Sequence, residues 1–144
     1  MGPFSRIASE AMVNIMTKCK DEITENWREL TMKKYRVVFH LTEIERANLA
    51  LNNVRNLLAE LGEDQVDAEV VTNSEGVKAL LKSSPRSEGI DELSAKGVRF
   101  VLCSKSLKAM GLEKSEFVTI AEVVPSGTGE LVKKQAEGWA YVRP

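Results

Sequence analysis

The chain has 144 residues and a formal net charge of −1, with 20 lysines and arginines against 21 aspartates and glutamates. One hydrophobic core organises about 100 to 150 residues, so we expect one main domain. Because basic and acidic residues are mixed, the sequence lacks the basic patch of a direct nucleic-acid binder. Its apolar runs are much shorter than the roughly 20 residues of a membrane helix, so we expect a cytoplasmic protein that does not contact a membrane.

Two cysteines, Cys19 and Cys103, and one histidine, His40, limit the chemistry that the chain can support. They are too few for a zinc site or a disulfide framework within one chain, so we expect neither a metal nor another cofactor. Cysteine chemistry would then depend on a single thiol, which remains reduced in the cytosol.

Residues 1–31 look separate from the rest, because Met32 precedes a strand-like run as a natural start codon would. Apolar residues recur here every three or four positions, which predicts an amphipathic helix over about Ser9–Leu30. We expect it to pack against the domain or a neighbouring subunit; alternatively, it is a translated upstream segment that is amphipathic by chance. The apolar stripe consists of Met12, Met16, Cys19, Ile23, Trp27 and Leu30.

Strand-like and helix-like segments alternate through residues 32–144. β-Branched and aromatic runs predict five strands, at Lys33–Leu41, Val66–Thr72, Val98–Leu102, Phe117–Val124 and Trp139–Val142. Apolar periodicity and end signals predict five helices, at Thr42–Leu61, Glu75–Leu81, Ile90–Lys96, Ser104–Met110 and Glu130–Ala136. This alternation predicts an α/β fold: a three-layer α/β/α sandwich with a parallel or mostly parallel five-stranded sheet.

Local signals place the ends of some of these segments. Thr42 and Glu45 have the spacing of a capping box, and Gly62 can end the same helix in a left-handed conformation. Residues 83–89 are expected to form an exposed loop, and residues 126–129 a turn.

The best place for a functional site is the carboxyl edge of the sheet, where ligands of open α/β sheets collect. Four short segments follow predicted strands there: His40 with Thr42, Asn73 with Ser74, Cys103 with Ser104, and Ser126 with Gly127. Whether these residues meet depends on strand order, which the sequence does not supply.

Cys103 is the strongest candidate, because a strand-to-helix junction directs unpaired backbone N–H groups at its sulfur and favours the thiolate. The alternative is a buried, inert cysteine. His40 alone is more typical of a structural histidine than of a catalytic base. The segment at Ser126 and Gly127 could hold an anion on backbone N–H groups, although it lacks the lysine of a phosphate-binding loop. Trp139 and Tyr141 are expected to pack against the core or a neighbouring subunit.

Two stretches together resemble the DsrE/DsrF-like family, especially its small archaeal and bacterial members. They are VRFVLCSKSL from Val98 and the ending VPSGTG…QAEGWAYVRP from Val124. The resemblance extends over about Lys33–Pro144. Relatives include the DsrE and TusD subunits, whose cysteine accepts sulfur as a persulfide in sulfur oxidation and tRNA thiolation. Cys103 falls where that cysteine does, and the resemblance also implies homotrimers or hexamers.

The leading hypothesis is therefore a sulfur carrier or sulfurtransferase subunit, in which Cys103 takes sulfane sulfur from a donor protein and passes it to an acceptor thiol. No second cysteine lies nearby to resolve a persulfide within the chain, so the acceptor would be a partner. The alternative is a noncatalytic oligomeric module that binds a small anionic ligand through Asn73, Ser126 and Gly127. A third possibility is a structural partner whose function is carried by another subunit.

Overall fold

The computed structural model describes residues 12–18 and 35–144, and the chain divides after Lys33 into two units, each described by itself. Residues 12–18 form a helix in which Met12 and Met16 are exposed. The other members of the predicted stripe, Cys19, Ile23, Trp27 and Leu30, lie outside the described residues. The extent and packing of this helix therefore remain predictions.

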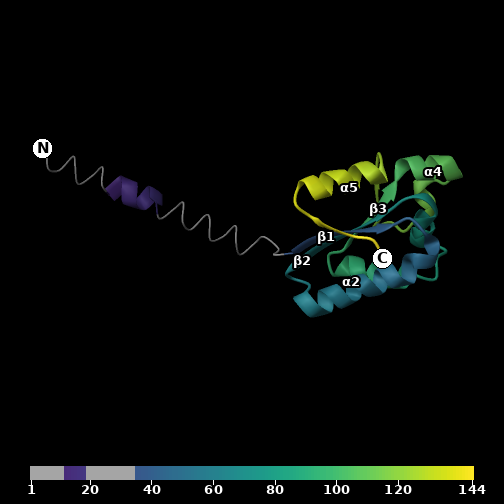
Figure 1. Ribbon diagram of the computed structural model, residues 1–144, viewed down its shortest axis with the longest axis horizontal. Helices are drawn as coiled ribbons and strands as arrows, with labels where there is room; N and C mark the ends of the chain where they lie inside the picture. Colours follow the sequence, from purple (N-terminus) through teal and green to yellow (C-terminus); the bar gives the residue numbers. More distant parts are fainter. Residues whose placement is uncertain (1–11, 19–34) are drawn as a thin grey trace, which may run out of the picture. The chain divides into compact units, whose positions relative to one another are not determined.

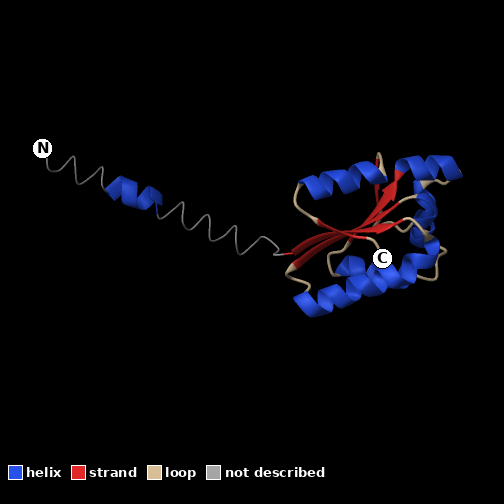
Figure 2. Cartoon of the chain, viewed as in Figure 1, coloured by secondary structure: helices blue, strands red, loops and turns tan. Residues whose placement is uncertain are grey.

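The second unit is built on one five-stranded sheet, in which every strand pair is parallel (Figures 1 and 2). The strand order is β4-β3-β2-β1-β5. This confirms the expected α/β/α sandwich with a parallel five-stranded sheet. The strands are β1 (Tyr35–Leu41), β2 (Val66–Thr72), β3 (Arg99–Cys103), β4 (Glu122–Val124) and β5 (Ala140–Val142).

Helices lie on both faces of the sheet, with α2 on one side and α5 on the other (Figure 1). The α-helices are α2 (Ala47–Leu61), α3 (Ser87–Ala95), α4 (Ser104–Met110) and α5 (Gly127–Ala136). Three 3-10 helices complete the domain: η1 (Ile44–Arg46), η2 (Ser74–Leu80) and η3 (Lys114–Glu116).

Alternation along the strands divides the core into two clusters. Val37 and Phe39 of β1 belong to the larger cluster, which includes the buried faces of α2 and α3. Val38 belongs to the smaller cluster, with Leu131 of α5 and Trp139. Successive side chains of a strand point to opposite faces, so each strand can supply both clusters. His40, two residues after Val38, therefore shares the α5 face of the sheet.

The start of the predicted helix at Thr42 is wrong in detail. The chain forms η1 first, and α2 begins only at Ala47, with no side-chain capping hydrogen bond at either start. Thr42 is not the N-cap residue, because the first turn starts at Glu43, whose carbonyl accepts from Arg46 N at 3.1 Å. The Thr42 carbonyl instead accepts from Gly76 N at 3.1 Å. The predicted stop at Gly62 agrees with its φ of 92°.

The predicted strand Phe117–Val124 is too long, because only Glu122–Val124 pairs in the sheet. Phe117 instead forms an isolated antiparallel bridge to Leu81, and Val118 N donates to Leu80 O. Both residues are buried, so their hydrophobicity reflects core packing in an irregular segment.

Two helices begin earlier than expected. Ser87 starts α3 inside the predicted loop, and Gly127 starts α5 inside the predicted turn. The reason at α5 is a capping hydrogen bond: Ser126 Oγ accepts from Gly129 N at 3.2 Å.

A buried carboxyl group lies on the α5 face of β2. Glu69 is fully buried, and its Oε2 is 2.9 Å from Arg99 Nη1 and 3.6 Å from Lys134 Nζ. Among the described residues, no donor pairs with its buried Oε1 when both Glu69 and Glu130 are ionised. The pKa of Glu69 is raised to about 7 in total. Burial is the largest cause, followed by a hydrogen bond with Glu130 that needs a protonated carboxyl and by the charge of Glu130, while Arg99 and Lys134 oppose the rise.

We expect this group to make stability fall as pH rises from about 5 to 7. The folded pKa of Glu69 is about 7 against 4.5 for the ordinary side chain, so the folded state binds more protons in this window. The loss at pH 8 relative to pH 4.5 should approach about 3 kcal/mol. Urea unfolding across this range should show the fall in the wild type and a flatter profile in Glu69→Gln. Parallel profiles for the two proteins would contradict it.

The domain boundary gives a second prediction. Within the described ranges, 12–18 and 35–144, both buried clusters consist of residues from Val37 onward. Deleting residues 1–31 should therefore leave the domain folded, with a change of less than about 1 kcal/mol in the free energy of unfolding. Circular dichroism and urea unfolding of the truncated chain check this, and a truncated chain that does not fold would show that the boundary is misplaced.

Candidate functional site: a thiol at the carboxyl edge of the sheet

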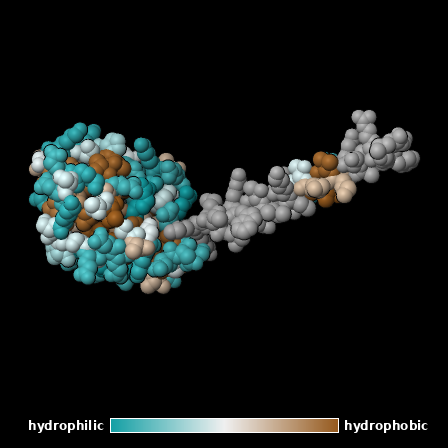
Figure 3. Space-filling view, turned by 180° about the vertical axis from the view of Figure 1, so that it is seen from behind, coloured by the Kyte–Doolittle hydropathy of each residue, from teal (hydrophilic) through white to brown (hydrophobic). Residues whose placement is uncertain are grey.

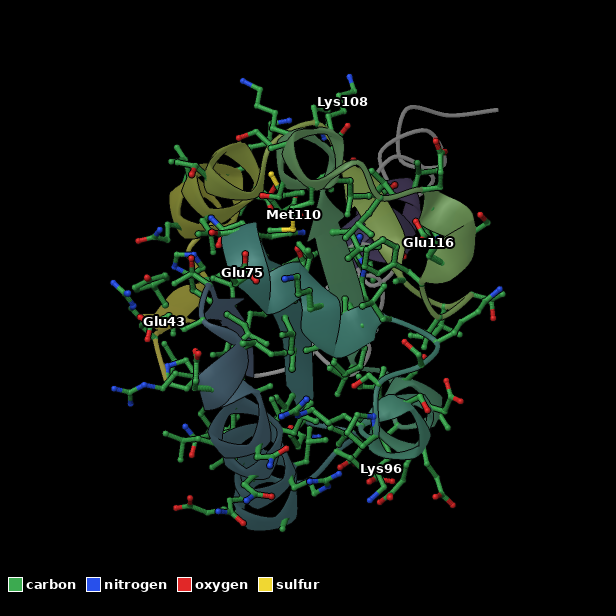
Figure 4. The ribbon with its side chains drawn as sticks, turned by 90° about the vertical axis from the view of Figure 1, so that its right-hand side faces the viewer. Glu43, Glu75, Lys96, Lys108, Met110 and Glu116 are labelled. Atoms are coloured by element: carbon green, nitrogen blue, oxygen red, sulfur yellow. The ribbon has the colours of Figure 1, made fainter. Side chains whose placement is uncertain are left out.

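The strand order brings three of the predicted segments together, because β1, β2 and β3 are neighbours. Leu41 pairs with Thr72, and Thr72 pairs with Leu102, so these strands end side by side. Figure 4 looks onto this edge: η2, which carries Glu75, crosses in front of the strand ends, and α4, which carries Lys108, lies above it.

Cys103 is the last residue of β3 and the N-cap residue of α4. Its side chain is 6% exposed and forms no disulfide. The start of α5 packs against it closely, because a Cβ added to Gly127 would lie 3.3 Å from Cys103 Cβ and 3.1 Å from Asn73 Cβ. Glycine at this position therefore lets the backbone of α5 approach both β2 and the thiol.

The surroundings favour the thiolate over the thiol. Burial alone would raise the pKa of Cys103, but hydrogen bonding from the Ser106 side chain and from the backbone amides of Gly127, Ser106 and Lys105 outweighs it and lowers the pKa. As a neutral thiol, the Cys103 side chain accepts no capping hydrogen bond from the start of α4. These donors act on the pKa because they stabilise an anionic sulfur much more than a thiol, which is a weak acceptor.

Ser106 connects the thiol to η2. Its Oγ accepts a hydrogen bond from Ser74 N at 2.8 Å, which leaves the hydroxyl proton free to be donated to sulfur. Ser74 has a φ of 48°, and no other non-glycine residue with positive φ occurs in the described ranges. A serine in this sparsely populated region is strained, so the turn that directs its N–H at Ser106 is maintained by the surrounding structure.

His40 and Asn73 form a second part of the site. His40 Nε2 lies 3.0 Å from Asn73 Oδ1, and His40 Nδ1 lies 2.8 Å from the hydroxyl of Tyr141. An amide oxygen only accepts, so Nε2 donates to Asn73 Oδ1, and Nδ1 is within hydrogen-bond distance of the Tyr141 hydroxyl. The histidine thus links β5 to Asn73, which contacts Gly127 beside the thiol.

The structure therefore places four predicted residues in one contiguous group: Cys103, Gly127, Asn73 and His40. Ser126 adjoins the group as the N-cap of α5. Ser104 lies just outside it, where with Lys105 and Lys108 it borders a surface cleft of about 480 Å³ that is closed on its other side by residues 123–125. Ser104 is the serine that the sequence predicts beside the charged sulfur, whereas the hydroxyl that lowers the pKa of Cys103 belongs to Ser106.

Two contributors escaped the sequence-based reasoning. Ser106 stands three residues after Cys103, the spacing at which a helix N-cap meets the N3 residue, and this signal could have found it. Tyr141 was expected only to pack, yet its hydroxyl bonds His40. Nothing local in the sequence links residues about 100 positions apart. Trp139, by contrast, is buried in the core as expected.

Chemically, the site offers one thiol that is biased toward its anion, with donors on one side and little exposure. Such a thiolate can act as a nucleophile toward a small electrophilic sulfur. Within the described residues, no group of three or more His, Cys, Asp or Glu side chains is placed to hold a metal. No helix in the described ranges is long and apolar enough to span a membrane.

The fold and site define a small parallel α/β protein with a thiol at the end of its third strand. The chain matches the DsrE/DsrF-like family over residues 25–144, and it belongs to this family. Among solved structures it is similar to MTH1491 from Methanobacterium thermoautotrophicum, described as a protein of unknown function, with 45% identity and a TM-score of 0.72 over 76% of this chain and 99% of that one. No curated protein matches the chain.

A second similar structure is the ychN protein from E. coli. The identity is 15% and the TM-score is 0.67, over 76% of this chain and 99% of the ychN protein. This likeness concerns the fold alone. The family match confirms the resemblance that the segments around Cys103 and at the carboxyl terminus predict. This family is commonly associated with sulfur relay.

Proposed function

We propose that this protein is a sulfur carrier or sulfurtransferase subunit that accepts sulfane sulfur on Cys103 as a persulfide. The observation that supports this most is that three elements converge on one thiol. The start of α4 supplies Ser106 and the start of α5 supplies Gly127. The third element, η2, acts through Ser74, whose N–H donates to Ser106 Oγ. A merely structural buried cysteine requires no such set of donors, because a neutral thiol behaves as a small hydrophobic group and is stable in an apolar core without them.

The proposed chemistry is exchange without net oxidation. The thiolate of Cys103 attacks the outer sulfur of a donor persulfide, so that a bond forms from Sγ to that sulfur and the donor's S–S bond breaks. The donor leaves as a thiolate and takes up the proton that Cys103 lost. In the second step an acceptor thiolate attacks the same outer sulfur, and Cys103 leaves as a thiolate stabilised by Ser106 and the amides.

Donor and acceptor are expected to be partner proteins that bring their thiols to this edge of the sheet. A noncatalytic module that binds a small anion at Asn73, Ser126 and Gly127 is the alternative. The two accounts differ in one respect that can be measured, because the module does not require the sulfur of Cys103.

The test is to incubate the purified full chain with a sulfane-sulfur donor and to locate the added sulfur by peptide mass spectrometry. Wild type and Cys19→Ser should both gain one sulfur atom on Cys103, and a reductant should remove it. Cys103→Ser should gain none while retaining its circular dichroism spectrum. If sulfur is added only to Cys19, or to no residue, the carrier account fails and the anion-binding module becomes preferable.

We further propose a homo-oligomer, either a trimer or a hexamer. Large hydrophobic side chains are exposed on the edge strands β4 and β5, just before β4, at the start of β1 and on α5. Figure 3 shows hydrophobic patches within a mainly hydrophilic surface. Burying such patches is the usual reason for symmetric assembly. The exposed residues are Tyr35, Ile120, Val123, Val132, Tyr141 and Val142.

Multi-angle light scattering at micromolar concentration should therefore give three or six times the mass of the 16.0 kDa chain. Val132→Lys, which places a charge on the exposed surface of α5, serves as a probe of which patch is covered. A wild-type mass equal to one chain would contradict the oligomer.

A further inference from the structure

A second polar site lies on the face of the sheet opposite α5, between α2 and α3. It is a pocket of about 290 Å³, large enough for a small hydrated anion. Its walls are mainly polar and include two arginines. The lining residues are Asn48, Leu51, Asn52, Arg55, Pro85, Arg86 and Gly89.

Each arginine is oriented by a neutral amide. Arg86 Nε donates to Asn48 Oδ1 at 2.8 Å, and Arg55 Nη1 donates to Asn52 Oδ1 at 3.1 Å. Asn48, Asn52 and Arg55 stand at positions i, i+4 and i+7 of α2, so they share one face of that helix. Each amide uses only one guanidinium donor, which leaves most donors of both arginines available to a ligand.

In the part of the chain that the structure describes, neither guanidinium has a carboxylate partner. The basic residues that do form ion pairs there are Lys78, Lys96, Arg99, Lys134 and Arg143. Two half-buried cations that line one small pocket repel each other, and a bound anion would remove that cost.

The pocket is also shaped for close approach to the backbone. A Cβ added to Gly89 would lie 2.5 Å from Arg55 Nη2, so glycine is what lets this guanidinium rest against the first turn of α3. The first backbone N–H groups of a helix have no partner within the helix. At the start of α3, Arg86 N donates to Ser84 Oγ and Ser87 N to Ser84 O, so the donors for a ligand are the two guanidinium groups.

We propose that this pocket binds an oxyanion of the phosphate class, held by Arg55 and Arg86. Planar guanidinium groups match the paired oxygens of such anions and form charge-assisted hydrogen bonds with them. The same chemistry could come from free inorganic phosphate or from the phosphate group of a larger metabolite. The site is separate from Cys103 and does not depend on the proposed sulfur transfer.

The experiment is calorimetric titration of the full chain with inorganic phosphate and, in a second arm, with glycerol phosphate, at constant ionic strength. Arg55→Gln and Arg86→Gln should each weaken binding about tenfold, the factor expected for a lost charge-assisted hydrogen bond. Lys133→Gln makes the same change in net charge on exposed α5 and should bind as the wild type does. Tighter binding of glycerol phosphate would identify a phosphorylated metabolite as the ligand, and tighter binding of inorganic phosphate the free anion.

Gly89→Ala separates a binding role from a structural one, because it displaces Arg55 without removing a charge. It should weaken phosphate binding while leaving the circular dichroism spectrum unchanged. The proposal is overturned if the wild type binds neither anion at 10 mM, which is on the order of ten times a Kd of about 1 mM. It is also overturned if the arginine variants bind as tightly as Lys133→Gln.

Discussion

Gly76→Ala is expected to destabilise the domain by about 3 kcal/mol and to disturb the thiol site with it. A Cβ at position 76 would lie 2.1 Å from the carbonyl oxygen of Leu41 and 2.7 Å from its carbonyl carbon. Both are backbone atoms at the end of a central strand, so neither can move without breaking the hydrogen bonds around them. Overpacking of this kind costs about 1 to 3 kcal/mol, and more when backbone must shift.

The same substitution should slow alkylation of Cys103. Gly76 is in η2, and η2 carries Ser74, whose N–H is bonded to Ser106 Oγ. Displacing η2 moves the donor that orients the Ser106 hydroxyl. Urea unfolding measures the stability change, and the rate of iodoacetamide labelling measures the effect on the site.

Gly129→Ala is the matched control. Its added Cβ would meet Ser126 Cβ at 3.5 Å, an ordinary contact, and the position is in α5, where alanine is the better helix former. This variant should be as stable as the wild type or more stable by up to about 1 kcal/mol. Equal stability of Gly76→Ala and Gly129→Ala would show that Gly76 does not lie against the Leu41 carbonyl as closely as described.

Ser106→Ala should raise the pKa of Cys103 and slow its alkylation at pH 7 by about threefold or more, because the side-chain donor to the sulfur is lost. The pKa of Cys103 lies below the ordinary thiol value in the wild type, so the rate of alkylation should reach its plateau at lower pH than that of a free cysteine peptide. In Ser106→Ala the profile should move to higher pH.

Ser104→Ala provides the control for this measurement, since it removes a hydroxyl one residue after the thiol, whereas the side-chain donor to the sulfur is Ser106. Measuring both variants in a Cys19→Ser background confines labelling to Cys103. Identical pH–rate profiles for Ser104→Ala and Ser106→Ala would contradict the assigned role of Ser106.

Much of the fold could be predicted because its elements carry local signals. The helix that ends at Gly62 and the buried strand Val66–Thr72 are both found as expected, since apolar periodicity and a terminating glycine depend only on neighbouring residues. The predicted strand Phe117–Val124 is too long because no local signal marks where sheet pairing begins. A buried irregular segment and a strand have the same hydrophobicity, and only pairing with Cys103 and its neighbours distinguishes Glu122–Val124 from the rest.

The site was predictable only in outline. The residues at the strand ends could be named from the sequence, because a parallel sheet places all carboxyl ends at one edge. Their contacts could not, because strand order decides which ends are neighbours. The bond between His40 and Tyr141 joins β1 to β5, and the contact of Gly127 with Cys103 depends on how closely α5 packs.

The most direct test of the carrier account follows sulfur through Cys103. Protein loaded from a donor with radiolabelled sulfane sulfur is freed of excess donor and mixed with a small acceptor thiol. The account predicts that label leaves the protein for the acceptor, that the chain returns to its unmodified mass, and that Cys103→Ser carries no label at any stage. Label that stays on the protein in the presence of the acceptor, or that loads equally onto Cys103→Ser, would contradict it.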